Sequence, residues 1–196
     1  MNALLAVSRL IDRMSDRIGH TIYWLVLVAV LISAANAIVR KAFNYSSNSY
    51  LEIQWYLFSL IFLFCAGYTL KNNEHVRIDI ITSRLSARAR AAIDIFGTLF
   101  FLLPMAFLIM WLSWPVFIQA FQRNEVSTNA GGLVIWPARL LVPIGFGFLI
   151  LQGLSEFIKR VAFLRGLIPD PSQRKGEKSA EEELAEEILR ARGEQA

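Results

Sequence analysis

The sequence predicts an all-α integral membrane protein with four transmembrane helices, an interfacial amphipathic segment, and both termini in the cytoplasm. Three observations support this prediction. The chain is 55% hydrophobic, with a mean hydropathy of +0.45 and only 18% charged residues, against about 25% in soluble domains. Its apolar residues form four long runs. Its lysines and arginines cluster in alternate connections between those runs.

Each run is close to the length that a spanning helix needs, about 20 predominantly apolar residues. A helix also satisfies its own backbone hydrogen bonds, which the hydrocarbon interior requires. We place the spans at about residues 21–39, 53–70, 95–120 and 140–158, within a membrane domain of residues 21–168. A basic segment, residues 1–20, precedes this domain, and a polar tail, residues 169–196, follows it.

The first run raises the question of a cleaved signal peptide. Ala35-Asn36-Ala37 has the small-residue form of a cleavage site. However, the run follows a twenty-residue leader that contains Asp12 and Asp16, which is more typical of an uncleaved signal anchor. We therefore expect the first run to remain as a transmembrane helix, with cleavage as the alternative.

Helix-breaking residues interrupt the third and fourth runs. They are Pro104, Pro115, Pro143, Gly145, Gly147 and Gly153. Transmembrane helices tolerate such residues as kinks or points of close contact, whereas some transporters use them as hinges or unwound ion sites. We favour kinks and close contacts, because the breaks are not accompanied by carboxylates or a polar cluster.

The distribution of basic residues predicts the orientation. Fourteen lysines and arginines lie before the first span, between the second and third, and at the start of the tail. The two opposite connections hold three, or four if Arg139 lies outside the membrane. Cytoplasmic loops carry the excess of basic residues, so we expect both termini in the cytoplasm. Basic residues that face anionic lipid headgroups also explain the net charge of +4 without a nucleic-acid partner.

The decapeptide KNNEHVRIDI, residues 71–80, follows the second run directly. Lys71 should end the second helix, where a cation suits the helix dipole and lipid headgroups, and the two asparagines favour a turn. If the segment then continues as a helix, His75 and Asp79 are i, i+4 neighbours. We expect these two to fix the segment by local hydrogen bonds or ion pairs.

The same helix would place Arg77, Arg84 and Arg88 on one stripe beside apolar residues, as in a segment that lies along the inner membrane interface. Arg77 would then anchor the segment to lipid or to a larger partner, and Lys71, Arg84 and Arg88 would face the lipid interface. The alternative is a solvated loop whose charges only set topology.

Glu52 and Arg139 bound the second and fourth spans at the outer side. A carboxylate and a guanidinium at matching depth can pair across helices. The alternative is that each side chain extends separately to the headgroups.

The composition of the spans argues against catalysis and against transport by this chain alone. No ionisable residue lies near the middle of any span, where ion and substrate pathways carry them. The only histidines, His20 and His75, should lie at the cytoplasmic edge, which makes a bis-histidine haem anchor a poor alternative. The single cysteine, Cys65, allows no disulfide within the chain. These observations predict no cofactor, no enzyme, and a scaffold or accessory subunit.

The tail contains EEELAEEILRAR, in which Glu186 and Arg190 are spaced i, i+4. This favours a short solvated helix. A docking helix for a partner is the alternative, although its apolar stripe is narrow.

Residues 50–81, YLEIQWYLFSLIFLFCAGYTLKNNEHVRIDII, resemble the small membrane subunit (DctQ-like) of tripartite ATP-independent periplasmic (TRAP) transporters. The matching features are Glu52, Trp55-Tyr56, Ala66-Gly67, a following basic residue, and the run from His75 to Asp79 through Arg77. Length, four helices and the expected topology also fit, so that the resemblance covers about residues 18–165.

The resemblance implies a small permease subunit in the bacterial inner membrane. Its partners would be a large multi-span membrane subunit, which carries the substrate and ion sites, and a periplasmic solute-binding protein, which delivers an organic acid. A sodium gradient would drive uptake. The small subunit would enlarge and anchor the static part of the membrane complex and contribute to docking the binding protein. NYSSNSYLEIQWYLF is closest to members associated with 2-oxo acids and related carboxylates. The competing class is a four-helix membrane scaffold or anchor unrelated to transport.

The predicted topology is testable by cysteine labelling. In a Cys65-free background, single cysteines at Ser47, Ser86 and Ser179 are exposed in turn to a membrane-impermeant maleimide. We expect only the Ser47 site to react from outside, because the basic residues hold the other two segments in the cytoplasm. Labelling of the Ser86 site in intact cells would overturn the topology.

Overall fold

The computed structural model describes residues 2–44, 47–73 and 85–171. The elements in these ranges are α1 (Asn2–Phe43), α2 (Asn48–Lys71), α4 (Ala87–Gly97), the π-helical segment η1 (Thr98–Leu102), α5 (Leu103–Gln122) and α6 (Trp136–Leu164). Because α4, η1 and α5 form one continuous helix, the described ranges contain four helices that are long and apolar enough to cross a membrane. This confirms the predicted all-α fold with four candidate spans.

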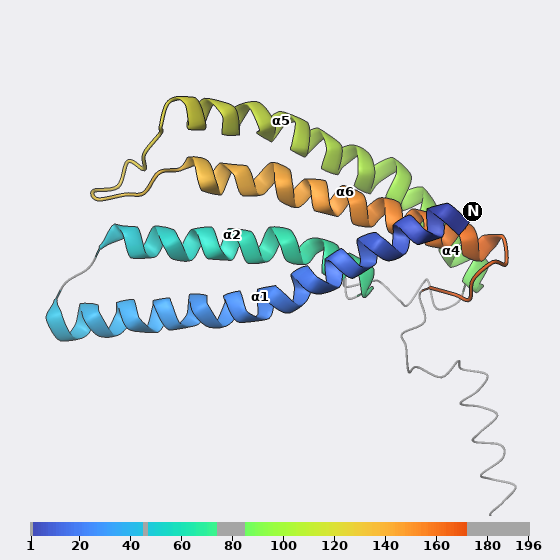
Figure 1. Cartoon of the computed structure of the whole chain (residues 1–196), viewed down its shortest axis with the longest axis horizontal. Coiled ribbons are helices and arrows are strands. Elements are labelled where there is room, and N and C mark those ends of the chain that lie inside the picture. Colours follow the sequence, from blue (N-terminus) through green and yellow to red (C-terminus); the bar gives the residue numbers. More distant parts are fainter. Residues whose placement is uncertain (1, 45–46, 74–84, 172–196) are drawn as a thin grey trace, which may run out of the picture.

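The helices lie side by side in a single layer, in the order α1, α2, α6, α5 (Figure 1). The continuous helix formed by α4, η1 and α5 packs on α6, and α1 bends across the end of α2 to reach α6 as well. We call the end where α1 joins α2 and α5 joins α6 the loop end, and the opposite end, near the N-terminus, the charged end. A single layer buries little side-chain surface, and the buried apolar residues in the described part of the chain are mostly alanines.

Helix α1 buries one narrow seam of small residues. Its buried positions are Ser8, Ser15, Gly19, Ile22 and Ala29. Their spacing of seven, four, three and seven residues is that of a coiled-coil seam. A Cβ atom on Gly19 would lie 2.5 Å from the Tyr68 ring of α2, so this contact between α1 and α2 requires glycine.

Helix α6 lies between α2 and α5 and is the most buried of the four. Small residues let its neighbours approach closely, as in other membrane helix pairs. A Cβ atom on Gly145 would lie 2.7 Å from Leu63 Cβ of α2. The helix continues through Pro143, and α5 continues through Pro115.

The π-helical segment η1 lies directly before Pro104. Proline cannot donate to the carbonyl four residues earlier, and its ring collides with that carbonyl in a regular helix. A wider turn at this point keeps the helix continuous past the proline.

The helices extend beyond the spans placed from sequence. With 42 residues, α1 is about 63 Å long at 1.5 Å per residue, about twice the thickness of the hydrocarbon core. The leader before the first apolar run is therefore not a separate segment in the structure, but the first part of α1.

The connection after α2 begins as predicted, with Lys71 as the last helical residue and a turn at Asn72 and Asn73. Helix α4 then begins only at Ala87, because Ser86 is extended and its Oγ accepts a hydrogen bond from Ala89 N at 3.3 Å. A single helical stripe through Arg84 and Arg88 is therefore wrong at this boundary. His75, Arg77, Asp79 and Arg84 themselves lie outside the described residues.

Candidate functional site at the two ends of the helix layer

At the loop end, residues 123–135 between α5 and α6 form a folded connection that we call the anchored loop. Val126 and Val134 form an isolated antiparallel bridge. Ser127 N donates to Leu133 O, and Ile135 N donates to Glu125 O, both at 2.9 Å. These backbone bonds close the loop into a hairpin.

Glu52, in the first turns of α2, binds this loop through its carboxylate. Its side chain is buried, with the whole residue 3% exposed. One carboxylate oxygen accepts from Leu133 N at 2.6 Å, and the other accepts from Asn129 Nδ2 at 2.9 Å and from Ser127 Oγ. Hydrogen bonds to an ionised acceptor are stronger than neutral ones, so Glu52 fixes the loop against α2.

Other polar side chains of α2 add to this attachment. Asn48 Nδ2 donates to Ala130 O at 3.1 Å, and Tyr56 OH donates to Val134 O at 3.0 Å. Ser49 Oγ donates to Gly131 O. The start of α2 therefore holds a loop that lies about 80 residues further along the chain.

The structure does not bring Glu52 and Arg139 together. Arg139 makes a two-pronged ion pair with Glu125, at 2.6 and 3.0 Å. Because residues 123–135 form a hairpin beside the start of α2, Glu125 lies close to Arg139, and the hairpin supplies three donors to Glu52. Neither the predicted pair nor separate extension of Glu52 toward headgroups describes these contacts.

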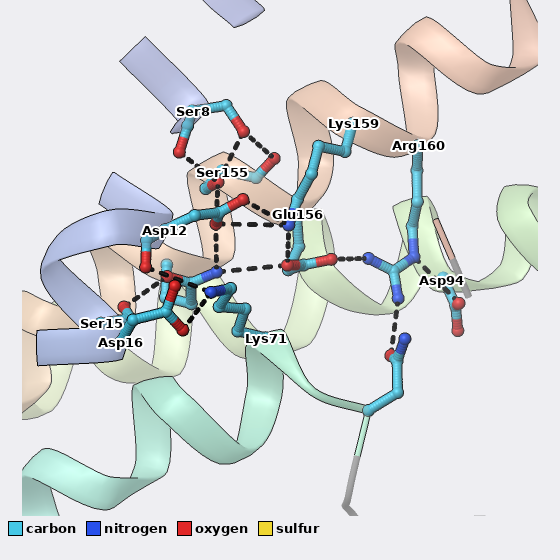
Figure 2. A network of polar contacts seen from close by, with 12 residues as sticks. Ser8, Asp12, Ser15, Asp16, Lys71, Asp94, Ser155, Glu156, Lys159 and Arg160 are labelled. Atoms are coloured by element: carbon cyan, nitrogen blue, oxygen red, sulfur yellow. Dashed lines mark hydrogen bonds and ion pairs between the residues drawn. The ribbon is translucent and has the colours of Figure 1, made fainter. Parts of the chain in front are cut away.

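At the charged end, polar side chains from four helices meet in one network (Figure 2). One part of this network is gathered around Asp12 of α1. This carboxylate accepts from Ser155 Oγ at 2.9 Å, Gln152 Nε2 at 3.0 Å and Lys159 Nζ at 3.1 Å, all on α6. Ser15 Oγ of α1 also donates to Gln152 Oε1 at 2.6 Å. Both ion pairs and neutral hydrogen bonds therefore join α1 to α6.

Glu156 and Arg160 form the other side of the network. Arg160 Nη1 donates to Glu156 Oε2 at 2.6 Å, and both side chains are at most 4% exposed. Arg160 Nε also donates to Asp94 Oδ2 of α4 at 2.9 Å, while Nη2 donates to Asn73 Oδ1 at 3.3 Å, just beyond α2. Lys159 Nζ lies 2.5 Å from Glu156. Arg160 therefore connects α6 to α4 and to the end of α2.

Lys71 turns toward the protein and does not face the lipid interface as predicted. Its ammonium pairs with Asp16 of α1 and donates to Asp12 O at 3.2 Å, and its side chain is 17% exposed. The physical reason is the length of α1, which brings two carboxylates beside the end of α2. Arg88 is exposed on α4, so its expected position at a lipid interface remains a prediction.

The charged end network was missed from sequence, because the acids of residues 1–20 were assigned to a leader outside the helix layer. A signal was present. Ser8, Asp12 and Ser15 recur at helical spacing on α1, as Gln152, Ser155, Glu156 and Lys159 do on α6. Two polar stripes of this kind can form hydrogen bonds and ion pairs with each other where their helices pack together. Chemically, the arrangement pairs four carboxylates with three cations, which suits a structural joint.

Replacing Glu52 by alanine should release the anchored loop. We expect hydrogen exchange at the Leu133 amide to become about tenfold faster or more, because that amide loses a hydrogen bond to a charged acceptor. Exchange mass spectrometry across residues 125–135 measures this change. The matched control is Glu125→Ala, which breaks a half-exposed pair and should affect exchange little. Equal effects of the two substitutions would contradict the role of Glu52.

Replacing Arg160 by methionine should destabilise the protein strongly. The change leaves Glu156 buried beside fewer partners, and breaking a buried pair costs about 3–5 kcal/mol. Arg165→Met, at an exposed position one turn later, should change stability by less than about 0.5 kcal/mol. Denaturant titration in mixed micelles gives both free energies of unfolding. A loss at Arg160 no larger than the loss at Arg165 would show that the network contributes little.

Comparison with known proteins adds one match to this geometry. Residues 29–163 match the family model described as tripartite ATP-independent periplasmic transporters, DctQ component. No curated protein and no solved structure matches the chain. The matched region covers more than half of the 196 residues, and it includes all of α2, α5 and the anchored loop. The chain therefore belongs to the DctQ component family of TRAP transporters, and it is a multi-pass inner-membrane transporter subunit that is not an enzyme.

Proposed function

We propose that this small permease subunit scaffolds the large transport subunit for sodium-driven, binding-protein-dependent uptake of an organic acid. The observation that carries the proposal is the separation of polar and apolar groups along the layer. The charged residues of the spanning helices lie toward their two ends, where several of the described ones make the contacts above. A sodium site needs oxygen ligands gathered within the bilayer. Those ligands belong on a second subunit.

The single layer also favours a partner. Its broad apolar surface includes aromatic residues of α5 that are more than half exposed, namely Phe107, Trp111 and Trp114. Lipid tails and a second set of helices can both cover such a surface. Small residues suit close helix packing in membranes, and a layer tied at both ends presents its surface on a rigid support.

We assign the loop end to the periplasm and the charged end to the cytoplasm, in accordance with the excess of basic residues near the charged end. The anchored loop then faces the binding protein. A loop fixed by Glu52 loses little conformational entropy when a partner docks. The substrate class that we favour, a 2-oxo acid or related carboxylate, rests on the sequence around α2 alone.

Reconstitution tests whether transport requires the large subunit. Vesicles that contain this chain alone should show no sodium-dependent uptake of a 2-oxo acid. Vesicles with the large subunit as well should take it up when the binding protein and a sodium gradient are supplied. The large subunit should also co-purify with this chain in mild detergent. Uptake by this chain alone would refute the scaffold role, and failure of the large subunit to co-purify would favour a scaffold unrelated to transport.

A further inference from the structure

An open groove of about 510 Å³ follows one side of the helix formed by α4, η1 and α5. Ile93, Gly97, Phe101 and Met105 line it in successive turns. A spacing of four residues drifts around an α-helix, which has 3.6 residues per turn. The wider π turn of η1 reverses that drift, so the four residues stay on one face.

Gly97 forms an open part of this groove. A Cβ atom at this position would meet nothing within 4 Å, in contrast to the helix contacts at Gly19 and Gly145. Gly97 therefore serves no close approach between described helices. Its missing side chain leaves space beside Phe101 and Met105, which are 67% and 64% exposed.

A cationic residue lies one helical turn before the groove, toward the charged end. Arg90 is exposed and lies three and four residues before Ile93 and Asp94, on the same stripe of α4. Asp94 also lines the groove, but its carboxylate is paired with Arg160 at 2.9 Å. Helical side chains lean toward the N-terminus, so Arg90 leans away from the apolar stretch.

We propose that this groove binds one acyl chain of an anionic phospholipid, whose phosphate contacts Arg90. An arginine one turn beyond an apolar channel matches the order of groups in a phospholipid, with phosphate outside and hydrocarbon inside. A soluble ligand does not suit a groove whose flanking residues are exposed apolar side chains on a spanning helix. The proposal is independent of the scaffold role, because it concerns only the side chains of this helix.

Photocrosslinking tests the site on the full chain. The protein is reconstituted in vesicles of equal parts phosphatidylglycerol and phosphatidylcholine, with a trace of phosphatidylglycerol that carries a diazirine in its acyl chain. We expect crosslinks to concentrate at residues 93–105. Arg90→Gln should reduce them about fivefold, the contribution of one basic residue near an anionic membrane surface. Gly97→Leu should reduce them at least as much, because leucine fills the open space.

Two matched controls lie on the opposite face of α4. Arg88→Gln removes an exposed arginine, and Ala92→Leu adds the same bulk at an exposed position, so both should keep wild-type crosslinking. Circular dichroism of each variant establishes that the helices are retained, and Arg90→Gln tests the site without any added bulk. Even labelling along the helix, or equal yields in Gly97→Leu and wild type, would overturn the proposal. Crosslinks that vanish when the large subunit is co-reconstituted would also overturn it, in favour of a protein occupant.

Discussion

The buried ion pair between Glu156 and Arg160 is the contact on which the charged end depends. Removing two charges from water costs several kcal/mol per ion, which is recovered only when further hydrogen bonds satisfy the pair. Asp94 and Asn73 supply acceptors for Arg160, and Lys159 supplies a cation for Glu156. These partners come from α4, from the end of α2, and from α6 itself. Burying one pair on the central helix therefore requires its neighbours to meet at the same place.

Different interactions hold the helices together at the two ends of the layer. Membrane helices gain no hydrophobic energy from leaving lipid for each other, so packing and polar contacts must associate them. In the middle, small residues such as Gly19 and Gly145 allow close packing. At the loop end, the carboxylate of Glu52 gathers donors from a hairpin. At the charged end, carboxylates and cations pair directly. These contacts hold in one arrangement a layer whose described residues bury little apolar surface.

Much of the fold was predictable from sequence, because span length and charge depend on local composition. The four spans, the turn after Lys71 and the continuity of the helices past their prolines followed from such local rules. The partners of individual charges did not. Arg139 binds Glu125, fourteen residues away, because the intervening residues form a hairpin, and no helix-spacing rule describes a hairpin.

The polar network was hidden for a related reason. Charges near the end of an apolar run resemble a topology signal, and nothing local distinguishes a carboxylate facing water from one facing another helix. Asp12 meets α6 only because α1 continues as a helix well before its apolar run begins. Asp16 pairs with Lys71 for the same reason. In both cases, the local sequence did not indicate that α1 begins so far before its apolar run.

The joining of α1 to α6 also constrains the order of assembly. Residues 8 and 155 are separated by 147 positions, so Ser8 and Asp12 of the first helix find their side-chain partners only after the last helix has been made. Domains generally form as units during synthesis, and non-local pairing is slow because the intervening loop must first close. A nascent chain that stops before α6 leaves Asp12 without Ser155 and Lys159. A chain truncated before α6 therefore exposes an unpaired carboxylate at Asp12, and the joined helix layer forms only after the final helix has been made.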